Sequence, residues 1–207
     1  NGCLTFGPRV VEMDYLMQRS DPLLRLGRHH LVTLSGKYPS SAFLVRWYGN
    51  KLLCVDSECS IPNPLSSYPR GRPMPLARGA ISRAIMAFLP RRQLERMIRT
   101  NQEELASIGL GSSMPEILDA MRSVRHAGFA IAHGEVTPGV VGVAAPIFNE
   151  STVPIGALCV TIAENETDDD RLISIATDVR NATYEISAAF TNYPKTEPAE
   201  QRPRRFA

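Results

Sequence analysis

The chain is 207 residues long, 43% of its residues are hydrophobic, and its formal net charge is +2. A chain of this length can bury a substantial core, most simply as one domain with extensions. The weak net charge argues against nucleic acid or an anionic membrane as a direct partner. No apolar run approaches the roughly 20 residues of a membrane span, and no charged-then-apolar leader opens the sequence. Because Cys3, Cys54, Cys59 and Cys159 include no CxxC pair, we expect a reduced, cytoplasmic protein with free thiols.

The first 60 residues predict two helices and a strand hairpin. Pro8 stands at a good first helical position, and Asp21 can cap a second helix that stops near Gly36. The stretch "SAFLVRWYGNKLLCVDSE" is typical of two strands joined at a tight turn, Gly49-Asn50. The proline-rich stretch that follows, "IPNPLSSYPRGRPMP", must run extended or turn.

Three more helices are predicted between Gly79 and Gly128. One face of the first helix carries a set of apolar residues: Ala80, Ile81, Ala84, Ile85 and Phe88. Pro90 ends this helix, and "RRQLERMIRT" begins the next. After a polar loop at 109–113, "MPEILDAMRSVRHAG" is helical and Gly128 is its C-cap.

Short strands and one long helix complete the pattern. The strands are expected at Phe129 to Ala132, Gly139 to Phe148 and Pro154 to Ala163. The long helix is expected to start at Thr167, with Asp170 at the position of a capping-box partner. Its buried stripe is Leu172, Ile175, Ala176, Val179, Ile186 and Phe190. The tail, 192–207, lacks periodicity and contains three prolines, so we expect it to be flexible.

The last two strands have one face of small residues. Successive side chains of a strand point to opposite sides of the sheet. One side therefore receives Gly142, Ala144, Ala157, Cys159 and Thr161, and the other receives Val143, Ile147, Leu158, Val160 and Ile162. The order of elements predicts an α+β fold, in which helices cover the larger side chains of an antiparallel sheet. The small face then borders either a cavity or a tightly packed helix–sheet junction.

The candidate chemical groups are few. The histidines form no cluster with metal-ligand spacing: His29, His30, His126 and His133. Glu135, in the turn "HGEVTPG", can act as a base or touch a ligand, although a turn carboxylate is usually solvated. Cys159 is the most plausible nucleophile, but a cysteine on a buried strand is usually an inert small hydrophobe. We assign no catalytic residue, no metal and no cofactor.

The start of the helix at Gly79 suggests a binding role. The first N–H groups, those of Gly79, Ala80 and Ile81, have no partner inside the helix and carry its positive dipole end. If they abut the small face, they can hold a carboxylate, to which the Thr161 hydroxyl adds a hydrogen bond. Close packing of the helix on the sheet explains the same small residues equally well.

Two longer stretches resemble a known family. "MPLARGAISRAIMAFLP" resembles the helix that opens the ligand pocket in effector domains of the isocitrate-lyase-regulator (IclR) family of bacterial transcription factors. "MRSVRHAGFAIAHGEVTPGVVGVAAPIFNESTVPIGALCVTI" is similar to the family's signature segment. "LTFGPRVVEM" resembles the stretch that joins the family's DNA-binding wing to its linker helix. The resemblance runs from about Leu4 to Phe190.

The resemblance implies a GAF-like effector-binding domain at 21–191. It would be preceded by the end of the DNA-binding wing and the linker helix at 1–20, and followed by the tail at 192–207. The implied ligand positions are Met74, Gly79, Ala80, Ile81, Ala132, Val140, Gly142, Cys159 and Thr161. Arg78 and Glu135 are additional candidate contacts. The chain departs from the family where Ser82-Arg83 replaces the usual Gly-Lys and where Ala132 replaces an acidic or polar residue.

The implied function is sensing rather than catalysis. A small organic acid, aliphatic or aromatic, would modulate DNA binding by a winged helix-turn-helix that the printed chain does not include. Expected partners are this acid, a second copy of the chain in a dimer or tetramer, and operator DNA through that absent domain; no membrane is expected. The alternatives are a thiol-dependent reductase that uses Cys159 and a module that only oligomerises.

Overall fold

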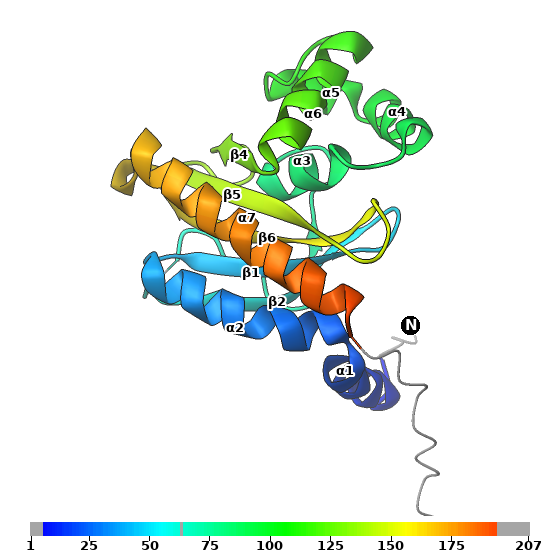
Figure 1. Cartoon of the computed structure of the whole chain (residues 1–207), viewed down its shortest axis with the longest axis vertical. Coiled ribbons are helices and arrows are strands. Elements are labelled where there is room, and N and C mark those ends of the chain that lie inside the picture. Colours follow the sequence, from blue (N-terminus) through cyan, green and yellow to red (C-terminus); the bar gives the residue numbers. More distant parts are fainter. Residues whose placement is uncertain (1–5, 63, 194–207) are drawn as a thin grey trace, which may run out of the picture.

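The computed structural model describes residues 6–62 and 64–193. Its centre is a six-stranded sheet in the order β3-β2-β1-β6-β5-β4, and every neighbouring pair is antiparallel (Figure 1). The strands are β1 Ser41–Trp47, β2 Leu52–Cys59, β3 Pro73–Met74, β4 Ala130–His133, β5 Val140–Phe148 and β6 Pro154–Ala163. The predicted α+β class with an antiparallel sheet is confirmed.

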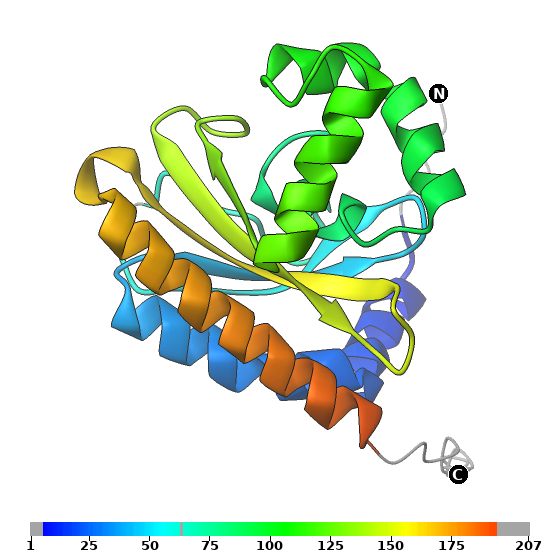
Figure 2. The ribbon, with the colours of Figure 1, turned by 45° about the horizontal axis from the view of Figure 1, so that its top comes forward.

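Helices lie on both sides of this sheet (Figure 2). They are α1 Arg9–Ser20, α2 Pro22–Lys37, α3 Ala80–Met86, α4 Arg91–Thr100, α5 Gln102–Ser107, α6 Met114–Ala127 and α7 Asp169–Thr191, with a 3₁₀ turn η1 at Glu164–Glu166. The two longest, α2 and α7, run side by side against one face. The short α3 packs on the opposite face, and α4, α5 and α6 gather beyond it.

The alternation of side chains along β5 and β6 divides the core in two. Val143, Leu158 and Val160 belong to the core shared with α2 and α7. Ala144 and Cys159 belong to the core shared with α3 and α6. The predicted division between a face of larger side chains and a face of small ones is therefore confirmed.

Local signals in the sequence placed several boundaries correctly. The Asp21 carboxylate accepts a hydrogen bond from the Leu23 N–H at 2.9 Å and so caps α2. Gly49 turns the β1–β2 hairpin with a φ of 82°, and Gly128 caps α6 with a φ of 78°. In both glycines the left-handed backbone avoids the strain that a Cβ would cause.

Two helix predictions were wrong in detail. The N-cap of α7 is Asp168 rather than Thr167, because its carboxylate accepts a hydrogen bond from the Arg171 N–H at 2.8 Å. Asp170 therefore does not occupy the capping-box position. Helix α3 has seven residues, ends at Met86, and is buried almost all round rather than on one face. It lies between the sheet and the helices beyond it, so burial reaches Ser82 as well.

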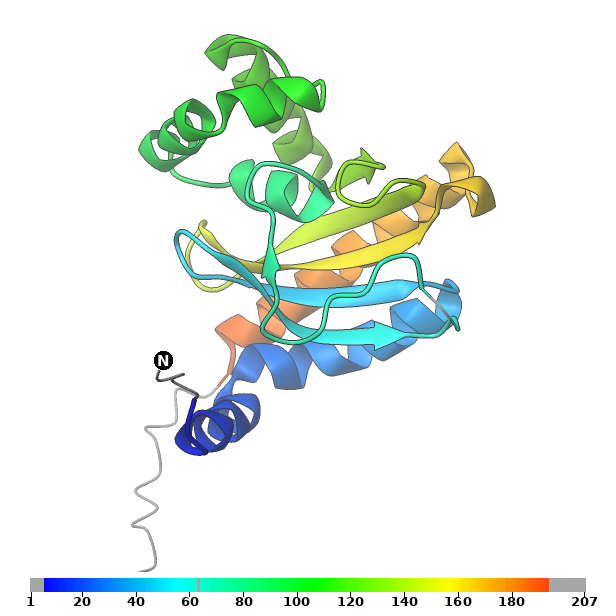
Figure 3. The same ribbon diagram turned by 180° about the vertical axis from the view of Figure 1, so that it is seen from behind.

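The helix α1 extends away from the body of the domain (Figure 3). It begins at Arg9, one residue after the predicted Pro8, and none of its residues is buried. Residues 1–5 with Cys3, and 194–207 of the predicted flexible tail, lie outside the described residues. The division at 1–20, 21–191 and 192–207 stays a prediction. Within the described part of the chain, no helix is long and apolar enough to cross a membrane.

Candidate functional site

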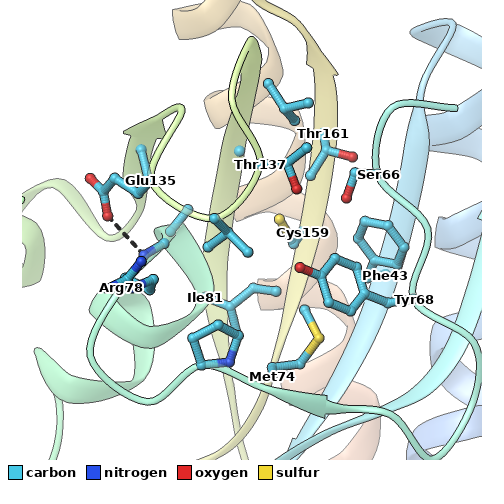
Figure 4. A pocket seen from close by; sticks show the side chains of 17 residues that line it. Phe43, Ser66, Tyr68, Met74, Arg78, Ile81, Glu135, Thr137, Cys159 and Thr161 are labelled. Atoms are coloured by element: carbon cyan, nitrogen blue, oxygen red, sulfur yellow. Dashed lines mark hydrogen bonds between the residues drawn. The ribbon is translucent and has the colours of Figure 1, made fainter.

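A cavity lies between the small face of the sheet, the start of α3 and the segment that leads to β3 (Figure 4). Its volume is about 50 Å³, which suits a few waters or a small ligand. Eleven residues named from the sequence line it: Met74, Arg78, Gly79, Ala80, Ile81, Ala132, Glu135, Val140, Gly142, Cys159 and Thr161. That these residues bind a ligand stays a prediction.

The small face proves to be part cavity and part packed junction. Gly142, Cys159 and Thr161 line the cavity, whereas Ala144 and Ala157 are fully buried in the core that includes α3. A Cβ on Gly142 would lie 3.6 Å from the Cβ of Ala80 and 3.9 Å from the Cys159 sulfur, which is ordinary contact. Both interpretations of the small residues are therefore correct, each for a different stretch of the strands.

The wall at the start of α3 differs from the prediction. The Gly79 N–H, expected to be free for a ligand carboxylate, donates to Glu135 Oε2 at 2.8 Å. Glu135 is not a solvated turn carboxylate, because its other oxygen pairs with the Arg83 guanidinium, and its side chain is only 10% exposed. Gly79 is also the N-cap of α3, with a φ of 86°, rather than its first residue.

Thr161 and Arg78, the other polar side chains predicted to contact the ligand, already donate hydrogen bonds within the protein. The Thr161 hydroxyl donates to the Ser41 carbonyl oxygen at 3.2 Å, so its oxygen remains available chiefly as an acceptor. Arg78 Nε donates to Glu104 Oε1 at 2.5 Å, and this guanidinium is therefore not aimed into the cavity as a grip on an acid.

Sequence reasoning missed six lining residues: Phe43, Ser66, Tyr68, Pro75, Val136 and Thr137. Figure 4 shows the hydroxyl groups of Ser66, Tyr68 and Thr137 facing the cavity. Tyr68 is held by an edge-to-face contact with Phe43, with ring centroids 5.4 Å apart. Ser66 and Tyr68 come from the proline-rich segment, whose path over the sheet has no sequence signal.

Cys159 lies at the floor of the cavity and is nearly inaccessible. Burial raises the pKa of its thiol to about 12, so the thiol is protonated at neutral pH and is a poor nucleophile. Cys54, Cys59 and Cys159 are free thiols. Among the described residues no group of three or more His, Cys, Asp or Glu side chains could hold a metal ion. Neither a reductase nor a metal centre gains support from this geometry.

The fold and the cavity together define a small-molecule-binding domain. Apolar side chains form most of the lining and a few hydroxyl groups face inward, a composition typical of ligand sites. Residues 29–188 match the family model "Bacterial transcriptional regulator IclR C-terminal". The chain therefore belongs to the IclR family and is the effector-binding domain of an IclR-type transcriptional regulator.

Individual relatives agree with this assignment. The HTH-type transcriptional regulator KipR of Bacillus subtilis (strain 168) is 33% identical over 189 residues, which cover 90% of this chain and 75% of KipR. The crystal structure of the Thermotoga maritima IclR matches with a TM-score of 0.77 at 17% identity, over 89% of this chain and 75% of that one. The C-terminal domain of the E. coli regulator KdgR matches with a TM-score of 0.70 at 19% identity, over 83% of this chain and 99% of that domain. KipR and KdgR are both named transcriptional regulators.

Proposed function

We propose that the cavity binds a small organic acid and that this binding changes the DNA affinity of a winged helix-turn-helix domain in the same regulator. The cavity between the small face and α3 is the observation that carries the proposal. KipR is named an HTH-type regulator, and the aligned region is 75% of its length, which leaves room in that relative for a DNA-reading segment.

The lining supports the choice of ligand. Ile81, Met74 and Gly142 offer apolar contact to a short carbon chain. The hydroxyl groups of Tyr68 and Thr137 can donate hydrogen bonds to carboxylate oxygens. A volume of about 50 Å³ favours a short aliphatic acid over an aromatic one.

The remaining partners follow from the surface. Val10, Met13 and Met17 on α1 are about half exposed or more, and we propose that a second copy of the chain covers them. The net charge of +2 gives this chain little electrostatic attraction to DNA, and we propose that specific binding to operator DNA needs the helix-turn-helix domain. Sequence-specific retardation of DNA by the chain alone, at physiological salt, would contradict this view.

Calorimetric titration with acetate, propionate and butyrate tests the ligand site. Thr137→Val keeps the side-chain shape but removes a hydroxyl that faces the cavity and can donate to the acid, so we expect affinity to fall by ~1–3 kcal/mol, the range for losing a partner of a charged group. Ala80→Phe should abolish binding by filling the cavity. Thr177→Val, a matched change on the exposed side of α7 where the hydroxyl bonds only to Ile173 O, is the control. If the Thr137 and Ala80 variants both bind like the parent, the site lies elsewhere.

A further inference from the structure

The turn between β4 and β5 forms one wall of the cavity. Glu135, Val136 and Thr137 of this turn all line it, and Val136 is also 38% exposed to solvent. Gly134 and Gly139 flank these residues with φ values of 63° and 73°. The turn thus stands between the cavity and solvent, with a glycine at each end that can change its backbone angles at low cost.

Two groups near the start of α3 hold this turn in place. The Gly79 N–H donates to Glu135 at 2.8 Å, and the Arg83 guanidinium pairs with the same carboxylate. A Cβ built on Gly79 would lie only 2.8 Å from Val136 Cγ2. The turn is therefore seated directly on Gly79, and a single side chain, Glu135, makes its polar contacts with α3.

The ion pair in this contact is unusually buried for this protein. The Arg83 and Glu135 side chains are 15% and 10% exposed, against 39% and 34% for the pair between Arg78 and Glu104. Removing one partner of a buried pair leaves an uncompensated charge. If Arg83 is removed, the turn can carry the Glu135 charge into water because it lies at the surface. If Glu135 is removed, Arg83 keeps its hydrogen bond to the Ile131 carbonyl oxygen at 2.9 Å, and the turn loses its polar contacts with α3. In the closed arrangement Arg83 Nε is also buried without a hydrogen-bond partner among the described residues, which lowers the cost of opening.

We infer that the turn at 134–139 is a gate to the cavity. Glu135 is its latch, because the contacts of its carboxylate with the Gly79 N–H and the Arg83 guanidinium hold the gate closed. With the latch closed, Cys159 at the cavity floor is only 2% exposed. Opening the latch admits a molecule to the floor without unfolding the domain. The inference rests on the proposed function only in treating the cavity as the ligand site, and its test needs no effector.

The labelling rate of the Cys159 thiol reports how often the gate opens. The thiolate can attack methyl methanethiosulfonate, forming a disulfide to the methylthio group and releasing methanesulfinate. Because the thiol is buried, its reaction rate is proportional to the fraction of open molecules. Cys54 is also buried and has a pKa raised to about 11 by burial, but it does not line the cavity. Peptide mass spectrometry measures the labelling rates of both thiols in one sample.

The variants separate the latch from general stability. Glu135→Gln, Glu135→Ala and Arg83→Met each weaken the latch, and we expect Cys159 labelling to accelerate by about tenfold, the factor for one lost charge-assisted hydrogen bond. Glu104→Gln breaks the more exposed pair with Arg78 and should leave the Cys159 rate unchanged. The Cys54 rate should stay at the parent value in all four variants.

Two results would overturn the inference. If Cys159 is labelled at the parent rate in all latch variants, the turn is not the way to the cavity floor. If the rates of Cys54 and Cys159 rise in parallel, including in the conservative Glu135→Gln, opening is global unfolding rather than movement of the turn. Failure of every carboxylate to bind would refute the proposed ligand class and leave the labelling result standing, so the two ideas fail separately.

Discussion

Two glycines on the same β-hairpin should respond in opposite ways to replacement by alanine. Gly142 of β5 faces the cavity, where a new Cβ would meet Ala80, Cys159 and Thr161 at 3.6 to 3.9 Å. Gly156 of β6 lies against β1, where a Cβ would sit 2.3 Å from the carbonyl oxygen of Val45. The first site has room for a methyl group, and the second would require the backbone to move.

These contacts set the size of each effect. Gly142→Ala should be neutral or stabilise the fold by up to about 1 kcal/mol, because alanine reduces the conformational entropy of the unfolded chain. The same methyl group narrows the cavity, so binding of a short carboxylate should weaken even though stability is preserved. Gly156→Ala should destabilise the fold by at least about 2 kcal/mol, since overpacking against a backbone atom cannot be relieved by a side-chain rotation.

Urea denaturation followed by circular dichroism measures both variants against the parent. The expected order of midpoints is Gly142→Ala at or above the parent, and Gly156→Ala well below it, with similar m-values. A loss of more than about 1 kcal/mol in Gly142→Ala would mean that the small face at this point is tightly packed rather than open. Gly156→Ala with parent stability would refute the argument from the Val45 carbonyl.

Three further predictions concern other parts of the molecule. At neutral pH iodoacetamide should modify exposed Cys59 long before Cys159, whose pKa is raised to about 12 by burial; equal rates, read by peptide mass spectrometry, would restore the reductase hypothesis. Burial raises the pKa of Asp178, but the hydrogen bonds that it accepts, one of them from Lys37, outweigh burial and hold it below its ordinary value. The ionised Asp178 therefore stabilises the folded state at pH values above the pKa of an unfolded aspartate, and this stabilisation is lost as the pH falls below about 4. In Asp178→Asn, the free energy of unfolding measured by denaturant titration should therefore fall less on acidification than in the parent. Met13→Glu on exposed α1 should shift the chain toward monomer in sedimentation equilibrium; a parent that is already monomeric at micromolar concentration would contradict the proposed pairing.

Much of the local structure could be predicted because it depends on neighbours in the sequence. A capping carboxylate reaches only the next few N–H groups, so Asp21 was recognisable as the start of α2. Side chains alternate between the two faces of a strand, so assigning one residue of β5 or β6 to a face also assigns every other residue of that strand. The same locality limits precision, since two adjacent residues, Thr167 and Asp168, can each serve as a cap and only the folded backbone selects the second.

By itself, then, the sequence determined the class of fold, the two faces of the hairpin and, through the family resemblance, eleven of the residues that line one cavity. Only the tertiary structure decided that the Gly79 N–H belongs to Glu135, a residue 56 positions away. It also brought Ser66 and Tyr68 to the cavity, and it placed α3 over Ala144 and Cys159 at the cavity floor. The physical reason is that these contacts join segments far apart in the sequence, and no local pattern of residues in one segment identifies its partner in the other. The chain selects among possible pairings the one that buries the most apolar surface and leaves no buried charge without a partner.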